Sequence, residues 1–149
     1  MADLDATVDW AKATGRGDTS KLAITGFCWG GRIAWLYTAH NPNVDAAVAW
    51  YGRLEGSPSP LNPSHPIDHV AKMRGAVLGL YGEADQGIPM ASVEKMRAAL
   101  KAAGKSDQIV TYKDAGHAFH ADYRPSYRKE AAEDGWRRML EWFRRHQVA

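Results

Sequence analysis

The single cysteine of the chain, Cys28, lies between two glycines where an apolar run gives way to a helical pattern. Residues 22–27 form that short apolar run, which is typical of a buried parallel strand. Residues 30–37 follow with apolar side chains at helical spacing. A tight turn from strand to helix crowds the backbone, and Gly26 and Gly30 relieve the crowding on either side of Cys28. The pattern therefore predicts a nucleophile elbow with a thiol at the reactive position.

Such an elbow would place Cys28 near the first backbone N–H groups of the following helix, where partial positive charge favours a thiolate. The alternative is the role of most free cysteines, a small buried side chain. A reactive cysteine at an elbow needs an acid and a histidine. In this architecture they follow the nucleophile in that order, each just beyond a later strand.

Both partners are present in the expected order. Residues 76–82 form an apolar run rich in strand-forming side chains, and Asp85 follows it. Residues 108–112 form another such run, followed by His117. Three features in this order favour a catalytic cysteine over a buried one.

Each partner has a rival nearby. Glu83 follows the same run as Asp85, and Asp85 could instead cap the next helix. His120 competes with His117, but Gly116 directly precedes His117 and lets the loop turn its ring toward the elbow. We therefore predict Asp85 as the orienting acid and His117 as the base.

The chain resembles the dienelactone hydrolase family of α/β-hydrolases in three segments, GFCWGG, YGEAD and AGHAFH, at residues 26–31, 81–85 and 115–120. The resemblance extends from about residue 20 to the end of the chain. It implies a cysteine nucleophile with aspartate and histidine partners, which by motif are Cys28, Asp85 and His117. It also implies cleavage of an enol-lactone or related ester through a thioester intermediate, without a metal or organic cofactor.

Further site residues are predicted at the same edge of the sheet. The backbone amide of Trp29, directly after the nucleophile, would stabilise an oxyanion, and its ring could line the pocket or pack against the helix. Tyr51 and Arg53 follow the strand at residues 45–51, at the edge where open α/β sheets bind ligands. We predict both as wall or carboxylate-binding residues, and core packing is an equal alternative for Tyr51.

The stretch after His117 departs from the family pattern. Family members that bind acidic lactones carry an arginine a few residues beyond the histidine, whereas here the first arginine is Arg124. Phe119 and His120 are predicted as pocket walls, and Arg124 as a further substrate-binding residue.

Alternating strands and helices predict one α/β domain over residues 1–149, with a parallel sheet of about four strands flanked by helices. A helical stretch ending near Gly15 directly precedes the nucleophile strand. In the family, early strands come before that helix, so we expect a truncated α/β-hydrolase-like domain that lacks the usual amino-terminal strands. Residues 52–69 contain four prolines and are predicted as an irregular surface loop.

Composition excludes several other classes. Nineteen basic and seventeen acidic residues give a net charge of +2, which provides no general attraction to nucleic acid. A single cysteine excludes an intrachain disulfide, and no apolar run is long enough to span a membrane. No spacing of histidine, cysteine and acidic residues predicts a metal site. These features favour a cytoplasmic enzyme that acts on a small ester or lactone.

The predicted truncation also motivates a rival hypothesis. Without early strands, the edge of residues 22–27 would be exposed, and exposed apolar edges pair with other chains. The chain could then be a non-catalytic half-fold that dimerises or binds a partner, and an enzyme with this edge could form a homo-oligomer. A redox-sensing thiol is a weaker alternative, because no second cysteine is present to resolve a sulfenic acid.

Overall fold

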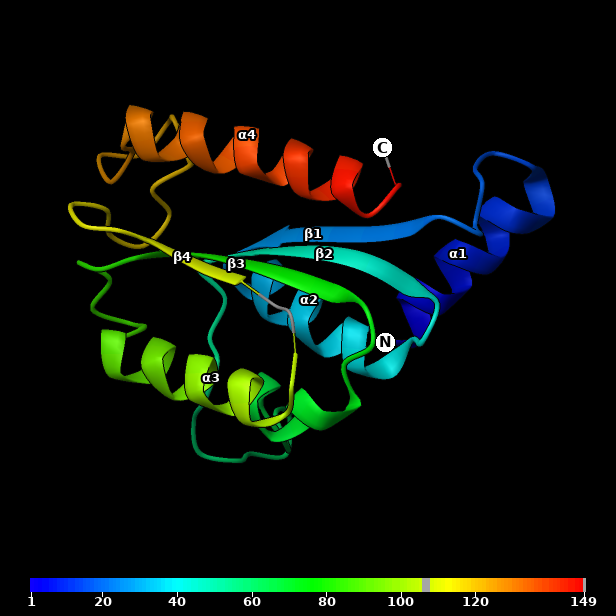
Figure 1. Cartoon of the computed structure of the whole chain (residues 1–149), viewed down its shortest axis with the longest axis horizontal. Coiled ribbons are helices and arrows are strands. Elements are labelled where there is room, and N and C mark those ends of the chain that lie inside the picture. The colour runs from blue at the N-terminus through cyan, green and yellow to red at the C-terminus, as the bar shows by residue number, and fades with distance from the viewer. Residues whose placement is uncertain (106–107, 149) are drawn as a thin grey trace.

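The computed structural model describes residues 1–105 and 108–148, and its centre is a parallel four-stranded sheet (Figure 1). The spatial order of the strands is their order in the chain. Their bounds are β1 Leu22–Phe27, β2 Val44–Trp50, β3 Ala76–Gly82 and β4 Gln108–Tyr112. The predicted fold class, a parallel sheet of about four strands flanked by helices, is confirmed.

Helices cover both faces of this sheet (Figure 1). The structure has α1 at Ala2–Thr14, α2 at Trp29–His40, α3 at Met90–Ala102 and α4 at Lys129–Arg145. Helices α2 and α3 lie on one face and α4 on the other, while α1 lies near the amino end of β1. No helix in the described part of the chain is both long and apolar enough to cross a bilayer.

The core is centred on β2 and β3, whose side chains are almost all buried. The indole N–H of Trp35 on α2 donates to the Tyr81 hydroxyl at 2.9 Å, and that hydroxyl donates to the Gly52 carbonyl at 2.9 Å. Both side chains are fully buried, so each polar group has the partner that burial requires. This chain of contacts fixes the backbone just beyond β2 against the core.

The prediction of an irregular surface loop at residues 52–69 is wrong in two respects. Leu54 is fully buried in the core, and Pro66–Lys72 form a 3₁₀ helix, η1. The helix begins there because Pro66 occupies its first position and the main-chain N–H of His65 donates to the carboxylate of Asp68. Prolines in this segment therefore start a short helix as well as breaking regular structure.

Strand β1 forms one edge of the sheet. It pairs only with β2 among the described strands, and its residues are half-buried or exposed. The ring of Phe27 at its carboxyl end is 39% exposed. This edge carries unpaired main-chain groups beside apolar side chains.

Candidate active site

Cys28 lies at a sharp turn between β1 and α2, which begins at the next residue. Its backbone has φ 55° and ψ −113°, a conformation that side-chain-bearing residues rarely adopt and that is found at functional turns. A Cβ atom on Gly26 would lie 2.3 Å from the carbonyl oxygen of Gly30, so only glycine fits there. The Cys28 side chain is exposed, which excludes the alternative of a small buried residue.

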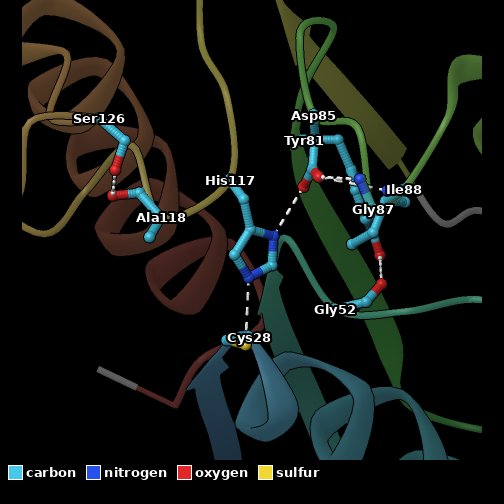
Figure 2. Close-up of polar contacts among 9 residues, drawn as sticks. All are labelled: Cys28, Gly52, Tyr81, Asp85, Gly87, Ile88, His117, Ala118 and Ser126. Atoms are coloured by element: carbon cyan, nitrogen blue, oxygen red, sulfur yellow. Dashed lines mark hydrogen bonds and ion pairs between the residues drawn. The ribbon is translucent and has the colours of Figure 1, made fainter.

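The structure brings Cys28, Asp85 and His117 together (Figure 2). The Nε2 atom of His117 lies 3.1 Å from Cys28 Sγ, and its Nδ1 atom lies 2.7 Å from Asp85 Oδ2. The three residues follow β1, β3 and β4, whose carboxyl ends meet at one edge of the parallel sheet. The parallel arrangement of the strands therefore brings into contact residues that are far apart in the sequence.

The carboxylate of Asp85 is held in place from its other side. Its Oδ1 atom accepts the backbone N–H groups of Gly87 at 2.8 Å and Ile88 at 3.2 Å, which leaves Oδ2 for His117. The rival acid Glu83 is exposed and instead accepts a hydrogen bond from the Thr111 hydroxyl. Of these two acids, Asp85 is the one in contact with the imidazole.

These contacts shift the pKa values of both partners. Burial alone would raise the pKa of Asp85, but hydrogen bonds from His117 and the Gly87 N–H outweigh it and lower the pKa. The hydrogen bond to Asp85 is the main cause that raises the pKa of His117 to about 9, against a smaller opposing effect of burial. The contact with Cys28 raises the pKa of His117 further. An imidazolium ring at neutral pH follows from this arrangement.

Tyr51 forms the wall beside His117. Its ring is buried, and it meets the His117 ring edge-on with 5.2 Å between centroids. Its backbone has φ 37°, so the chain turns sharply where β2 ends. Burial is the main cause that raises the pKa of Tyr51 to about 12. Tyr51 therefore combines core packing with a place at the site, the two alternatives that the sequence left open.

A cavity of about 560 Å³ opens beside the thiol. Six of the predicted site residues line it: Cys28, Trp29, Tyr51, Arg53, Asp85 and His117. The Trp29 ring is 57% exposed, so it does not pack into the core, and its backbone N–H lies in the first turn of α2. The cavity has the size of a small-molecule site.

The three predicted residues after His117 do not line this cavity. A φ of 60° at Ala118 turns the chain sharply, and Phe119 is fully buried against Trp50 and Tyr51. His120 packs beside Trp50 and lines a neighbouring hollow instead. Arg124 is exposed, and its guanidinium lies over the ring of Tyr123. Their positions therefore do not support Phe119 and His120 as walls of the cavity at the thiol, or Arg124 as a substrate-binding residue there.

Sequence reasoning missed several residues of the cavity wall, among them the polar residues Arg32, Asn62 and His65. Arg32 had a usable signal, because it comes four residues after Cys28 and so lies one helical turn away. Asn62 and His65 had none, since they lie in the proline-rich segment whose path the pattern does not predict. No group of three metal-ligating side chains was found within residues 1–105 and 108–148.

Comparison with known proteins shows the family of the chain. The model of the dienelactone hydrolase family matches residues 1–147. The chain belongs to that family. It is 62% identical over its whole length to a Methylorubrum extorquens protein named "Putative carboxymethylenebutenolidase", and 57% identical to one of the same name from Yersinia pestis. It covers 51% and 55% of those proteins, so it spans about half of their length.

Solved structures of family members and of more distant proteins share the fold. The crystal structure of a "Putative Dienelactone Hydrolase" from Klebsiella pneumoniae is 57% identical, with a TM-score of 0.92. The match covers 95% of this chain and 59% of that one. A Pyrococcus horikoshii acylaminoacyl peptidase matches at 16% identity with a TM-score of 0.79, over 96% of this chain and 27% of that one. The latter likeness concerns the fold alone.

Proposed function

We propose that this member of the dienelactone hydrolase family hydrolyses a carboxylic ester or lactone, with Cys28 as nucleophile. The observation that carries the proposal is the hydrogen-bonded series from Asp85 through His117 to the exposed thiol at the elbow. The names of the relatives support a hydrolase of this class. The cavity beside the thiol supplies room for a small substrate.

The first half of the reaction forms a thioester. His117 is protonated and holds the Cys28 thiolate as an ion pair, while Asp85 fixes the orientation of the imidazolium. The sulfur attacks the ester carbonyl carbon, and the C–S bond forms as the carbonyl oxygen gains negative charge. The Trp29 N–H in the first turn of α2 would donate to this oxyanion. The tetrahedral intermediate then collapses, and the leaving alkoxide takes the proton from His117.

The second half regenerates the thiol. His117, now neutral, removes a proton from a water molecule as that water attacks the thioester carbonyl. The C–S bond breaks, the thiolate returns to its pairing with the imidazolium, and the acid product leaves. No metal or organic cofactor takes part in this proposal.

Turnover of 4-nitrophenyl acetate and labelling by iodoacetamide at neutral pH test the proposal. We expect rapid labelling that is lost with turnover in Cys28→Ala, and a loss of about 10³-fold or more in turnover for His117→Ala. Glu83→Ala is the matched control, because Glu83 follows the same strand as Asp85 but does not reach His117. Undiminished turnover in Cys28→Ala would refute the thiol mechanism.

A further inference from the structure

The short turn at the end of β2, residues 50–52, packs against the nucleophile elbow. The backbone N–H of Cys28 donates to the Trp50 carbonyl at 2.9 Å. A Cβ atom on Gly31 would lie 2.4 Å from that same carbonyl oxygen, and one on Gly52 would lie 2.3 Å from the carbonyl carbon of Gly31. The turn is therefore in direct backbone contact with both the reactive residue and the first turn of α2.

Tyr51, in the middle of this turn, has an unfavourable backbone conformation. Its φ of 37° is rare for a residue with a side chain, and such a conformation persists only where neighbouring groups hold it. Its N–H donates to the Leu80 carbonyl at 2.8 Å, and its ring meets the ring of His117. The turn thus contacts both members of the thiol–imidazole pair, Cys28 through its backbone and His117 through the Tyr51 ring.

A hydrogen bond from the core holds the last residue of the turn (Figure 2). The hydroxyl of Tyr81 on β3 donates to the Gly52 carbonyl at 2.9 Å and accepts the indole N–H of Trp35 on α2 at 2.9 Å. Both side chains are fully buried. Burial raises the pKa of Tyr81, so its phenol stays protonated and remains a donor to the turn.

The Tyr81 ring is confined by its neighbours in the core. A Cβ atom on Gly79 would lie 2.8 Å from the Tyr81 ring and 3.1 Å from the Trp35 ring, so these two rings fill the space beside that glycine. Loss of the hydroxyl would leave the buried Gly52 carbonyl and the Trp35 N–H without their partner, which is costly inside a protein. The Gly52 carbonyl would then turn toward another donor, and Tyr51 would move with it.

We propose that Tyr81 is a positioning residue for the thiol–imidazole pair. Its buried hydroxyl holds the turn at residues 50–52 in the conformation that contacts both Cys28 and His117. In the described part of the chain this hydroxyl bonds only to an indole N–H and a main-chain carbonyl, so Tyr81 acts on the pair through the turn. Its role in turnover rests on the proposed function, whereas its effect on the pair itself does not require an ester to be cleaved.

The pH profile of iodoacetamide labelling at Cys28 tests this role in Tyr81→Phe, which removes one oxygen atom and keeps the ring. We expect labelling at neutral pH to slow about tenfold or more, because a displaced imidazolium stabilises less thiolate. The rates of the variant and the unmodified chain should converge at high pH, where the thiol ionises without help. Tyr37→Phe is the matched control, because Tyr37 is equally buried but bonds to Asp5 and Asn41. An unchanged profile in Tyr81→Phe would overturn the proposal.

Two further variants separate positioning from a general loss of stability. Trp35→Phe leaves a gap in the core but keeps the bond from Tyr81 to Gly52, so it should unfold at lower urea concentration and still label at the unmodified rate. Slow labelling in Trp35→Phe as well would reduce Tyr81 to a packing residue and overturn the proposal. If Tyr81→Phe does not fold, Gly52→Ala displaces the same turn from the side of α2 and should slow labelling. Normal labelling in that variant would contradict the role of the turn.

Turnover of 4-nitrophenyl acetate distinguishes this proposal from the proposed function. We expect Tyr81→Phe to lower kcat about tenfold or more with little change in KM, because the reacting pair is disturbed and not the binding of the ester. Slow labelling of Tyr81→Phe in a chain that cleaves no ester would support the positioning role and refute the proposed function. Rapid turnover by the unmodified chain, with kcat and labelling unchanged in Tyr81→Phe, would overturn the positioning role and leave the proposed function intact.

Discussion

Gly26 and Gly30 are in such close contact that a methyl group added to Gly26 would lie 2.3 Å from the carbonyl oxygen of Gly30. Gly26 is the second-last residue of β1, and Gly30 lies in the first turn of α2. Their contact therefore sets the angle between the strand and the helix. Cys28 lies between them with a positive φ. The contact thus fixes the position of the Cys28 thiol relative to His117 and Asp85, which follow the ends of β4 and β3.

Gly26→Ala should therefore disturb the elbow. The clashing atoms belong to the backbone of Gly30, which cannot move without shifting the first turn of α2. We expect a loss of about 1–3 kcal/mol in the free energy of unfolding, measured by urea denaturation, and a loss of turnover greater than the loss of stability explains. Gly17→Ala is the control, because a methyl group at Gly17 meets no atom within 4 Å. Equal behaviour of the two variants would contradict the role of the contact.

The raised pKa of His117 predicts a pH dependence of stability. The folded protein holds this proton more tightly than the unfolded chain, whose histidine titrates near 6.5. The contribution to stability is fully present below pH 6.5 and is lost as pH rises through about 9. Urea unfolding at pH 6, 8 and 10 measures the loss, and NMR titration of the imidazole nitrogens measures the pKa.

Asp85→Asn tests the cause of that shift. The carboxylate is the main reason for the raised pKa, so the variant should return the pKa of His117 toward its ordinary value. Glu83→Gln removes a nearby charge that does not touch the ring, and its His117 should still titrate near 9. A pKa that stays near 9 in Asp85→Asn would show that another group supports the imidazolium.

Cys28→Ser should keep the elbow and lose most of the activity. Serine fits the same space, but its hydroxyl does not ionise near neutral pH as a thiol does. An imidazolium that Asp85 keeps protonated has no free nitrogen with which to take the proton of a serine hydroxyl. We expect a fall of about 10²-fold or more in turnover of 4-nitrophenyl acetate, with unchanged thermal stability. Equal turnover in the serine variant would contradict the thiolate mechanism.

The edge of β1 leads to a prediction about assembly. Its unpaired main-chain groups lie beside the half-exposed ring of Phe27, a combination that favours pairing with another strand. We expect a homodimer or larger assembly of the chain, with β1 in the contact. Light scattering at micromolar concentration would show at least twice the chain mass of 16.4 kDa, and a uniform 16.4 kDa species would refute the assembly. Phe27→Lys should shift an assembly formed through this edge toward monomers.

Much of this architecture could be predicted from the sequence, because it rests on local patterns. The apolar runs gave the bounds of β1, β3 and β4, and the prediction for β2 differed by one residue at each end. Loop residues that directly follow strands, such as Asp85 and His117, could be placed near Cys28 because parallel strands end at a common edge. Strand order then brought them within contact distance.

Positions that depend on the path of a loop could not be predicted in this way. Phe119 enters the core because of a positive φ at Ala118, and alanine carries no signal for that conformation. His65 reaches the cavity because the segment before η1 folds back over α2, where the Ser64 carbonyl meets Arg32. Such contacts form between segments that are far apart in the sequence, and the periodicity of apolar residues does not predict them.

The segment between β2 and η1 has a consequence for how the molecule can change over evolutionary time. It contributes Arg53, Asn62 and His65 to the cavity, yet it carries none of the residues that bond to His117. Mutations and insertions in residues 53–65 can therefore change the substrate preference. The reacting groups Cys28, Asp85 and His117 would be unaffected, because they follow the ends of β1, β3 and β4. A chimera that exchanges this segment between family members should inherit the donor's substrate preference and retain the recipient's thiol chemistry.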